Sequence, residues 1–204
     1  MNMNVTLIGA SDMFARGFAT WAVAAGHNLT IVGFNRGQAE QLSNDIGAGR
    51  AAGPGDPLRD NLIFLAMPYN CVLDAWAFYG EQFDGKVVVD VTTPIDVETF
   101  EPIYPEAGSV AQEISKGRPG AKILKVFHPR FAGPLAPEQN SDDVRNVLLA
   151  GDDAEAKRLV TQFFKQGGLR AIDIGLLRRA RELEAVGFLR VALRLSLESI
   201  LAES

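Results

Sequence analysis

The sequence has a single cysteine, two histidines and no excess of basic residues over its 204 positions. With only Cys71, the chain cannot form an internal disulfide, which is typical of a reducing compartment. Its 20 lysines and arginines are outnumbered by 25 aspartates and glutamates, so a general nucleic-acid surface is not expected. No apolar run reaches the length of a membrane span, and the N-terminus has no signal-peptide pattern. These absences predict a soluble, cytoplasmic protein with no membrane partner.

Several catalytic motifs are also missing from the sequence. No cluster of cysteine and histidine has the spacing of metal ligands, so no metal site is expected. There is no G-x-S-x-G elbow, and the glycine-rich stretch 47–55 lacks the Gly-Lys-Ser/Thr ending of a phosphate-binding P-loop. Asp152 and Asp153 are expected to cap a helix. Cys71, among apolar residues of a predicted helix, is expected to be buried and inert.

What the sequence does contain is an alternation of short apolar runs and amphipathic stretches. Six runs predict strands, and their near-continuous hydrophobicity favours a parallel sheet covered on both faces: 4–9, 29–34, 61–67, 86–91, 121–127 and 144–151. Helical patterns lie between them at 13–25, 36–46, 69–80 and 153–166, whereas 47–57 is expected to be a loop. This order predicts an α/β fold, a Rossmann-like, doubly wound and mostly parallel sheet.

The last part of the chain differs from the rest, because it has no strand signal and predicts one long helix with a bend at Gly187. We therefore expect a nucleotide-binding domain over 1–175 and a C-terminal helical extension over 176–204. An apolar stripe recurs along this helix at steps of three and four residues: Val186, Leu189, Leu193, Leu197 and Ile200. The helix either packs against its own domain or is buried against a second copy; the extent of the stripe favours a homodimer.

The stretch VTLIGASDMFARG, residues 5 to 17, indicates a strand that turns into a helix. Backbone N–H groups at such a helix start can bind a pyrophosphate, and glycines permit its close approach. Gly9 ends the strand and Ser11 can cap the helix, but Asp12 stands at the position of the central glycine. A carboxylate there stabilises the helix by roughly 0.3–1 kcal/mol, yet it repels a phosphate unless it turns to solvent or is screened. Asp12 thus weakens the prediction of a dinucleotide site without cancelling it.

The end of the second predicted strand bears on cofactor choice. NAD-binding folds usually place an acidic residue there to bind the ribose hydroxyls. This chain has Gly33, Phe34, Asn35 and Arg36 instead. Arg36 can pair with a 2′-phosphate, and Phe34 or Arg36 can stack on adenine. The pattern favours NADP over NAD.

Four segments together carry a resemblance to a known family. Residues 151–186 follow the pattern G-D-D-x-E-A-K, then a helix, then G-(L/F)-x-x-(V/I)-D-x-G-x-L-x-x-(A/S)-R-x-(L/V)-E. FLAMPYNCVLDA at 64–75, VVVDVTTPID at 87–96 and KVFHPRFAGPL at 125–135 match further motifs. In these segments the chain resembles the coenzyme F420-dependent NADP reductases and their relatives, which include the cytosolic domains of six-transmembrane metalloreductases.

The resemblance implies a Rossmann-like domain that binds NADPH along the carboxyl edge of its sheet. By position, Ser11, Asp12, Met13 and Phe14 lie near the phosphates, and Asn35 and Arg36 near the 2′-phosphate. Met67, Pro68, Thr92 and Pro94 line the nicotinamide side. The chain departs from the family at Asp12 and Ala15, which replace glycines, and at Phe34 and Asn35, which replace a serine and an arginine. These departures bear on cofactor affinity more than on fold.

Two hypotheses about function remain open. The first is an NADPH-dependent oxidoreductase that passes hydride to coenzyme F420, a flavin or a small carbonyl or imine substrate, chemistry that needs little acid–base equipment. The second is a catalytically silent or nucleotide-sensing NADP(H)-binding protein. Asp12 favours the second; Arg36, Pro68 and Pro94 favour the first. No catalytic residue is evident. His128 either contacts the second substrate or makes a loop hydrogen bond, and His27 is expected to be structural.

Overall fold

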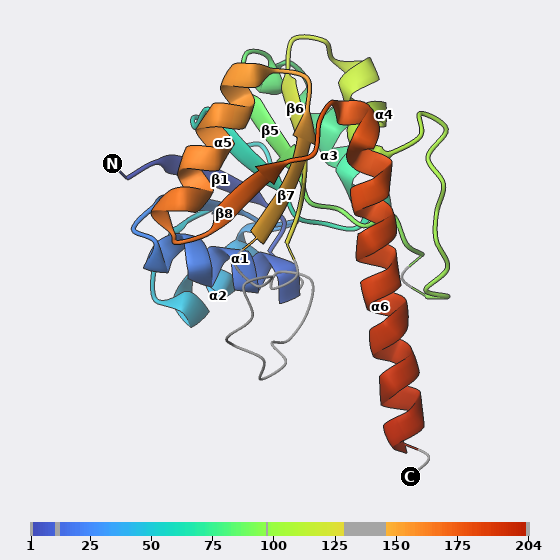
Figure 1. Cartoon of the computed structure of the whole chain (residues 1–204). Helices are drawn as coiled ribbons and strands as arrows, with labels where there is room; N and C mark the ends of the chain where they lie inside the picture. Colours follow the sequence, from blue (N-terminus) through green and yellow to red (C-terminus); the bar gives the residue numbers. More distant parts are fainter. Residues whose placement is uncertain (1, 11–12, 97, 129–145, 203–204) are drawn as a thin grey trace.

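The computed structural model describes residues 2–10, 13–96, 98–128 and 146–202, without the side chains of Met13 and of residues 194–202. Within this part of the chain, eight strands form one sheet in the order β3-β2-β1-β4-β5-β6-β7-β8 (Figure 1). All neighbours run parallel except β6 and β7. The strands are β1 Asn4–Ile8, β2 Asn28–Val32, β3 Arg50–Ala52, β4 Leu62–Leu65, β5 Val87–Asp90, β6 Lys122–Phe127, β7 Asn146–Gly151 and β8 Arg170–Asp173.

Helices cover both faces of this sheet. One face packs against α1 (Met13–Ala24), α2 (Arg36–Ile46) and α5 (Ala154–Gln166), and the other against α3 (Tyr69–Tyr79), α4 (Val110–Gly117) and the start of α6 (Ala180–Ala202). Two short 3₁₀ helices, Gly80–Phe83 and Leu177–Arg179, follow α3 and precede α6. Alternate strand residues enter the two cores, which is why the strands of the sequence read as continuously apolar.

The predicted fold class is confirmed, with three corrections to its elements. The expected loop 47–57 contains β3, an Arg-Ala-Ala edge strand without branched residues, which is held by pairing with β2. Strand β8 was not predicted. Helix α4 was also missed; it is short and begins at the cap Ser109, whose hydroxyl accepts a hydrogen bond from the Gln112 amide at 3.1 Å.

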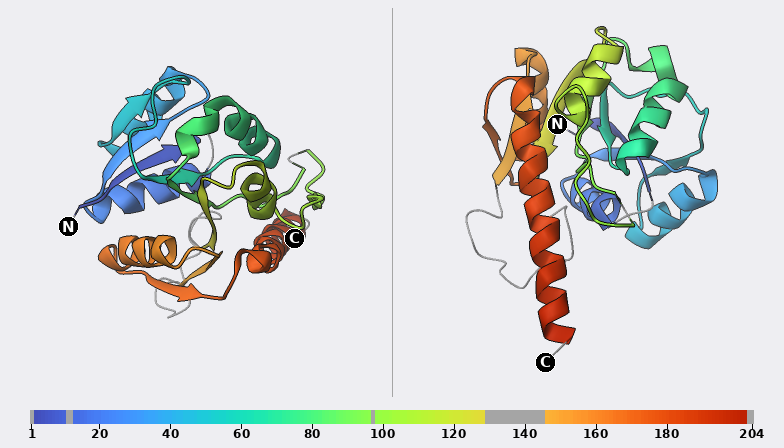
Figure 2. Two further views of the ribbon diagram at one scale, coloured as in Figure 1. Left: turned by 90° about the horizontal axis from the view of Figure 1, so that it is seen from above. Right: turned by 90° about the vertical axis from the view of Figure 1, so that its right-hand side faces the viewer.

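The long helix α6 is not interrupted at Gly187. Gly187 is buried, and a Cβ atom on it would lie 2.5 Å from Thr93 Oγ1, so this glycine permits the close approach of α6 to the segment after β5. Beyond it the helix extends past the sheet and the other helices (Figures 1 and 2). Val186, Leu189 and Leu193 are 42%, 58% and 65% exposed. Their own domain therefore leaves them uncovered; the side chains of Leu197 and Ile200 lie outside the described residues.

The predicted division of the chain at residue 175 stays a prediction. The start of α6 shares a core with the sheet. No helix in the described ranges is both long and apolar enough to cross a bilayer.

Candidate cofactor-binding site

The carboxyl ends of β1, β2, β4 and β5 lie side by side, since these strands are parallel neighbours. In a sheet of this order, the crevice between β1 and β4 is the switch point at which nucleotides bind. Gly9 follows β1 there with φ +114°, and a Cβ atom on it would lie 1.9 Å from the Ala66 carbonyl oxygen. The close approach of β1 to β4 therefore requires a glycine at position 9. This packing requirement is separate from the predicted phosphate turn.

A cavity of about 400 Å³ opens at this edge. Its wall is mostly apolar, with one carboxylate, and includes three of the predicted cofactor-binding residues, Gly9, Phe34 and Met67. Phe34 is 46% exposed, so its ring is free to cover a ligand at the rim. The remaining lining residues are Ile8, Val32, Gly33, Pro54, Cys71, Asp74, Ala75, Phe78 and Tyr79. Size and lining suit an adenosine group.

The predicted residues after β2 have clear local roles. Asn35 caps α2, its side-chain oxygen accepting a hydrogen bond from the Gln38 amide at 3.0 Å. Arg36 is the first residue of α2, and its guanidinium donates to Asp56 Oδ2 at 2.6 Å. The same oxygen accepts from the Gly53 amide at 2.9 Å. That backbone hydrogen bond, and then Arg36, hold the pKa of Asp56 below its usual range.

Asp56 is the main residue of this region that sequence reasoning missed. It lies 20 residues after Arg36, and the turn composition of 53–57 indicated a loop without indicating where the loop folds back. An acid from the turn after β3 therefore pairs with the arginine that follows β2.

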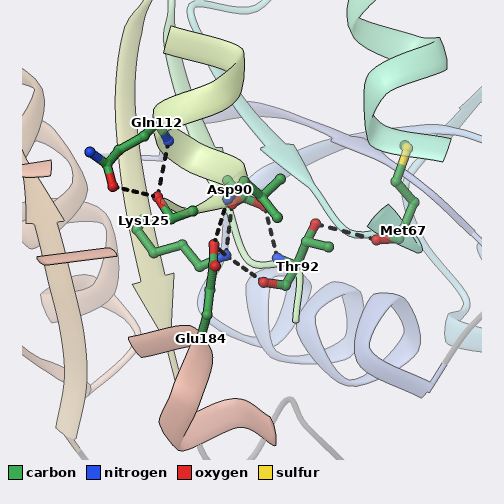
Figure 3. Close-up of polar contacts among 8 residues, drawn as sticks. Met67, Asp90, Thr92, Gln112, Lys125 and Glu184 are labelled. Atoms are coloured by element: carbon green, nitrogen blue, oxygen red, sulfur yellow. Dashed lines mark hydrogen bonds and ion pairs between the residues drawn. The ribbon is translucent and has the colours of Figure 1, made fainter. Parts of the chain in front are cut away.

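A buried ionic cluster joins the ends of β5 and β6 to α6 (Figure 3). Lys125 Nζ lies 2.7 Å from Asp90 Oδ2 and 3.0 Å from Glu184 Oε1, and also donates to the Thr92 carbonyl oxygen. Exposure of the three charged side chains is 2%, 0% and 6%. Burial alone would lower the pKa of Lys125, but the two carboxylates outweigh it and raise this pKa.

The same cluster fixes the predicted nicotinamide-side residue Thr92. Its amide donates to Asp90 Oδ1 at 2.8 Å, and its hydroxyl donates to the Met67 carbonyl oxygen at 3.3 Å, which ties the end of β5 to the end of β4 (Figure 3). Pro68, which directly follows Met67, is the N-cap residue of α3. This cluster could not be predicted from the sequence, because its charged residues come from three separate segments.

Pro94 lies apart from Met67, in the wall of a second cavity of about 530 Å³. This cavity is bounded by the segment 94–108 and by α6, and its lining is mostly apolar: Pro94, Pro102, Ile103, Tyr104, Pro105, Gly108, Arg181, Glu182, Glu184, Ala185 and Phe188. Of the four predicted nicotinamide-side residues, Met67 therefore lines the first cavity and Pro94 the second, whereas Pro68 and Thr92 line neither.

The remaining predicted site residues are Ser11, Asp12, Met13, Phe14 and His128. Ser11 and Asp12 lie outside the described residues, as does the side chain of Met13. Phe14 stacks on Phe18 with ring centroids 6.3 Å apart and packs against the core. His128 is 1% exposed and does not line either cavity, so its contact with a substrate stays a prediction.

Other sequence expectations can be compared directly. His27 is structural as predicted: it is buried, Nδ1 accepts from the Met3 amide, and Nε2 lies 3.3 Å from the Phe163 carbonyl oxygen. Asp153 caps α5 through the Ala156 amide. Cys71 was expected to be buried, which is wrong: it is partly exposed in the first cavity, although burial still raises its thiol pKa. The described ranges hold no group of residues suited to a metal ion.

Comparison with known proteins agrees with the sequence motifs. No protein-family model matches the chain. The F420-dependent NADP reductase of Methanocaldococcus jannaschii is 29% identical over 144 residues, 68% of this chain and 64% of the reductase. The F420-dependent NADP reductase of Methanothermobacter thermautotrophicus is 23% identical over 91% of this chain and 87% of its own length. The predicted resemblance to F420-dependent NADP reductases is confirmed.

Rat metalloreductase STEAP3 is 27% identical over 89% of this chain, which matches only 36% of STEAP3. Solved structures share the fold at lower identity. A hypothetical protein from Sinorhizobium meliloti superposes with a TM-score of 0.72 at 23% identity, over 87% of this chain and 86% of that chain. The 3-hydroxyisobutyrate dehydrogenase of Mycobacterium tuberculosis gives 0.66 at 12% identity, over 100% and 66%. These neighbours confirm a Rossmann-like α/β fold.

Proposed function

We propose that the chain is an NADPH-dependent oxidoreductase that moves hydride between NADP(H) and a second, small-molecule acceptor. The observation that carries the proposal is the apolar cavity at the ends of β1, β2 and β4, which is lined by Phe34 and Pro54, while Arg36 follows at the start of α2 and packs against Gly53, the residue before Pro54. An apolar slot for adenine next to a fixed cation is what a 2′-phosphorylated adenosine requires. The names of the F420-dependent NADP reductases that the chain matches support the same cofactor.

The residues of the site fit this cofactor. The first cavity takes the adenosine, with Phe34 over the base and Arg36 at the 2′-phosphate. The start of α1 faces the pyrophosphate by position in the fold. Pro68, Thr92 and Pro94 border the nicotinamide. NADPH bound there would supply a hydride, and the protein would orient the nicotinamide ring and exclude water. Thr92 would help to orient the ring, because the hydrogen bonds of its amide and hydroxyl fix its position.

The second cavity is the proposed acceptor site. Its volume and its proline, tyrosine and phenylalanine lining suit a planar, partly apolar molecule. A deazaflavin such as coenzyme F420, a flavin, or a small carbonyl or imine compound meets this description. Because Pro94 lines the cavity and directly follows the segment fixed by Thr92, an acceptor there is close to the predicted nicotinamide position.

We further infer a homodimer in which the exposed outer part of α6 is covered by a second copy. Leu189 and Leu193 are more than half exposed on a helix that extends past its own domain. Large aliphatic side chains repeated on one projecting helix form a surface that pairs by two-fold symmetry.

The cofactor assignment is tested by replacing Arg36 with alanine and measuring NADPH and NADH binding by calorimetry. The loss of a charge-assisted contact should weaken NADPH by about 1–3 kcal/mol and leave NADH nearly unchanged. Arg16→Ala is the matched control, since Arg16 is 53% exposed and also pairs with an aspartate at 2.6 Å. Equal losses for both cofactors would remove Arg36 from the 2′-phosphate site. Oxidation of NADPH, followed by absorbance with coenzyme F420, flavins and imines in turn, identifies the acceptor.

A catalytically silent NADP(H)-binding protein is the second candidate, and Asp12 in the phosphate turn is the observation that favours it. The two candidates differ in one measurement. Tight NADPH binding with no oxidation by any acceptor class supports the silent protein, and turnover with any one of them excludes it.

A further inference from the structure

The ion pair between Arg36 and Asp56 stands at the position where the proposed cofactor site must tell NADP from NAD. Asp56 Oδ2 lies 2.6 Å from Arg36 and 2.9 Å from the Gly53 amide, so the carboxylate is held from two sides. Gly53 also adjoins the arginine side chain, since a Cβ atom there would lie 3.5 Å from Arg36 Cβ and 3.6 Å from Nε. The turn 53–56 therefore lies against Arg36 and fixes where its guanidinium points.

This turn also borders the adenosine cavity. Pro54, two residues before Asp56, lines the cavity together with Phe34 and Gly33. The carboxylate is thus within a few ångströms of any group that binds Arg36 from the cavity side. Arg36 and Asp56 are 54% and 38% exposed, so their interaction is partly screened but still neutralises much of the local positive charge.

A 2′-phosphate that binds Arg36 has to meet this carboxylate as well. Two negative groups a few ångströms apart repel each other, and the guanidinium must share its donors between them. A ribose 2′-hydroxyl has the opposite preference, because a carboxylate accepts its hydrogen bond, as the acid at the end of strand two does in NAD-binding folds. Asp56, from the turn after β3, brings a carboxylate to the arginine that follows β2.

We propose that Asp56 is a specificity-determining residue that opposes Arg36, lowering affinity for the 2′-phosphorylated cofactor and admitting the unphosphorylated one. The inference rests on the proposed function, since it concerns the choice of dinucleotide at that site. With Asp56 present, the ratio of NADPH affinity to NADH affinity is smaller than Arg36 alone would produce.

The test uses two adenosine fragments, 2′,5′-ADP and 5′-AMP, which differ by the 2′-phosphate and leave the nicotinamide side empty. Binding of each to the full chain is measured by calorimetry for the native protein, Asp56→Asn and Asp56→Glu. Asp45→Asn is the matched control: Asp45 also pairs with an arginine at 2.6 Å, is 36% exposed, and lies in the last turn of α2.

Asp56→Asn should tighten 2′,5′-ADP by on the order of 10-fold at low ionic strength, with the gain shrinking as salt is added. Binding of 5′-AMP should stay the same or weaken. Asp56→Glu should retain the native ratio, and Asp45→Asn should change neither ligand. Binding of 2′,5′-ADP by Asp56→Asn alone, with none by the native chain, would also support the inference.

An unchanged ratio in Asp56→Asn, or weaker 2′,5′-ADP, would overturn it, since Asp56 would then only align Arg36. In that case dinucleotide binding itself survives, and the proposed function with it. No binding of either fragment, or of NADPH, by any variant would overturn both.

Discussion

Replacing Lys125 with methionine should be among the most damaging single changes in this fold. Lys125 is 2% exposed and gives all three of its ammonium protons to acceptors: Asp90, Glu184 and the Thr92 carbonyl. Two carboxylates already share one cation, so the cluster carries a net charge of −1. Methionine fills a similar volume but leaves both carboxylates buried without a counter-charge.

The magnitude follows from this charge balance. Breaking a buried ion pair by removing one partner costs about 3–5 kcal/mol, a large part of the roughly 5–15 kcal/mol that stabilises a typical domain. We expect a loss in this range in the free energy of unfolding, measured by urea titration with far-ultraviolet circular dichroism. Lys122→Met on the same strand is the control. Lys122 is 36% exposed and pairs with Asp153 at 3.3 Å, and loss of such a pair costs only about 0–1 kcal/mol.

Two further measurements separate charge from packing. Glu184→Gln keeps an oxygen that accepts from Lys125 and the Val110 amide, and it leaves a neutral pair, so it should cost less than Lys125→Met. Burial raises the pKa of Glu184 even beside Lys125, so this carboxyl binds a proton more readily in the folded than in the unfolded state. Without Lys125, stability should therefore fall as pH rises through the carboxyl range, and the deficit should shrink as pH is lowered through it. A Lys125→Met loss no larger than that of Lys122→Met would refute the reasoning.

Three other changes test the turn, the crevice and the dimer. Asp12→Gly should tighten NADPH binding and reduce its salt dependence, because a negative charge beside the pyrophosphate is removed; calorimetry that finds no gain would mean that Asp12 points away from the phosphates. Gly9→Ala should destabilise the fold by about 2–5 kcal/mol in urea titration, since the added Cβ meets the Ala66 carbonyl oxygen at a positive φ; a change below about 1 kcal/mol would contradict this packing. Leu189→Glu with Leu193→Glu should give a folded monomer by light scattering, and a native chain that is already monomeric at micromolar concentration would exclude the dimer.

The sequence was sufficient to predict the fold because its strongest signals are local. The continuous apolar strands and the helical pattern of 36–46 depend on neighbouring residues alone, and α2 begins and ends where that pattern does. Strand β3 was missed for the opposite reason. Arg50, Ala51 and Ala52 have little strand preference of their own and are extended only because they pair with β2.

The backbone positions of the candidate site could be predicted from the sequence, but its ion pairs could not. Gly9, Phe34 and Arg36 could be placed from the order of strands and turns, since each follows a strand at the carboxyl edge. Asp56 and the cluster of Asp90, Lys125 and Glu184 depend on contacts between distant segments. No periodicity in the sequence indicates such contacts, so neither the Arg36–Asp56 pair nor the buried cluster could be predicted.

The two anchors of α6 link the proposed dimer to the proposed acceptor site. Glu184 ties the first turns of the helix to Lys125 and through it to the Thr92 carbonyl, and Gly187 lies against Thr93. The residues after these anchors, Leu189 and Leu193, are the exposed ones. A partner that covers them would therefore act on a helix fixed to the segment that borders the second cavity through Pro94. The first cavity, proposed to take the adenosine, is lined mainly by residues of β1, β2 and α3 and by no residue of α6. The monomeric Leu189→Glu, Leu193→Glu variant should then bind 2′,5′-ADP like the native chain and lose acceptor reduction, and equal loss of both would mean that α6 supports the whole fold instead.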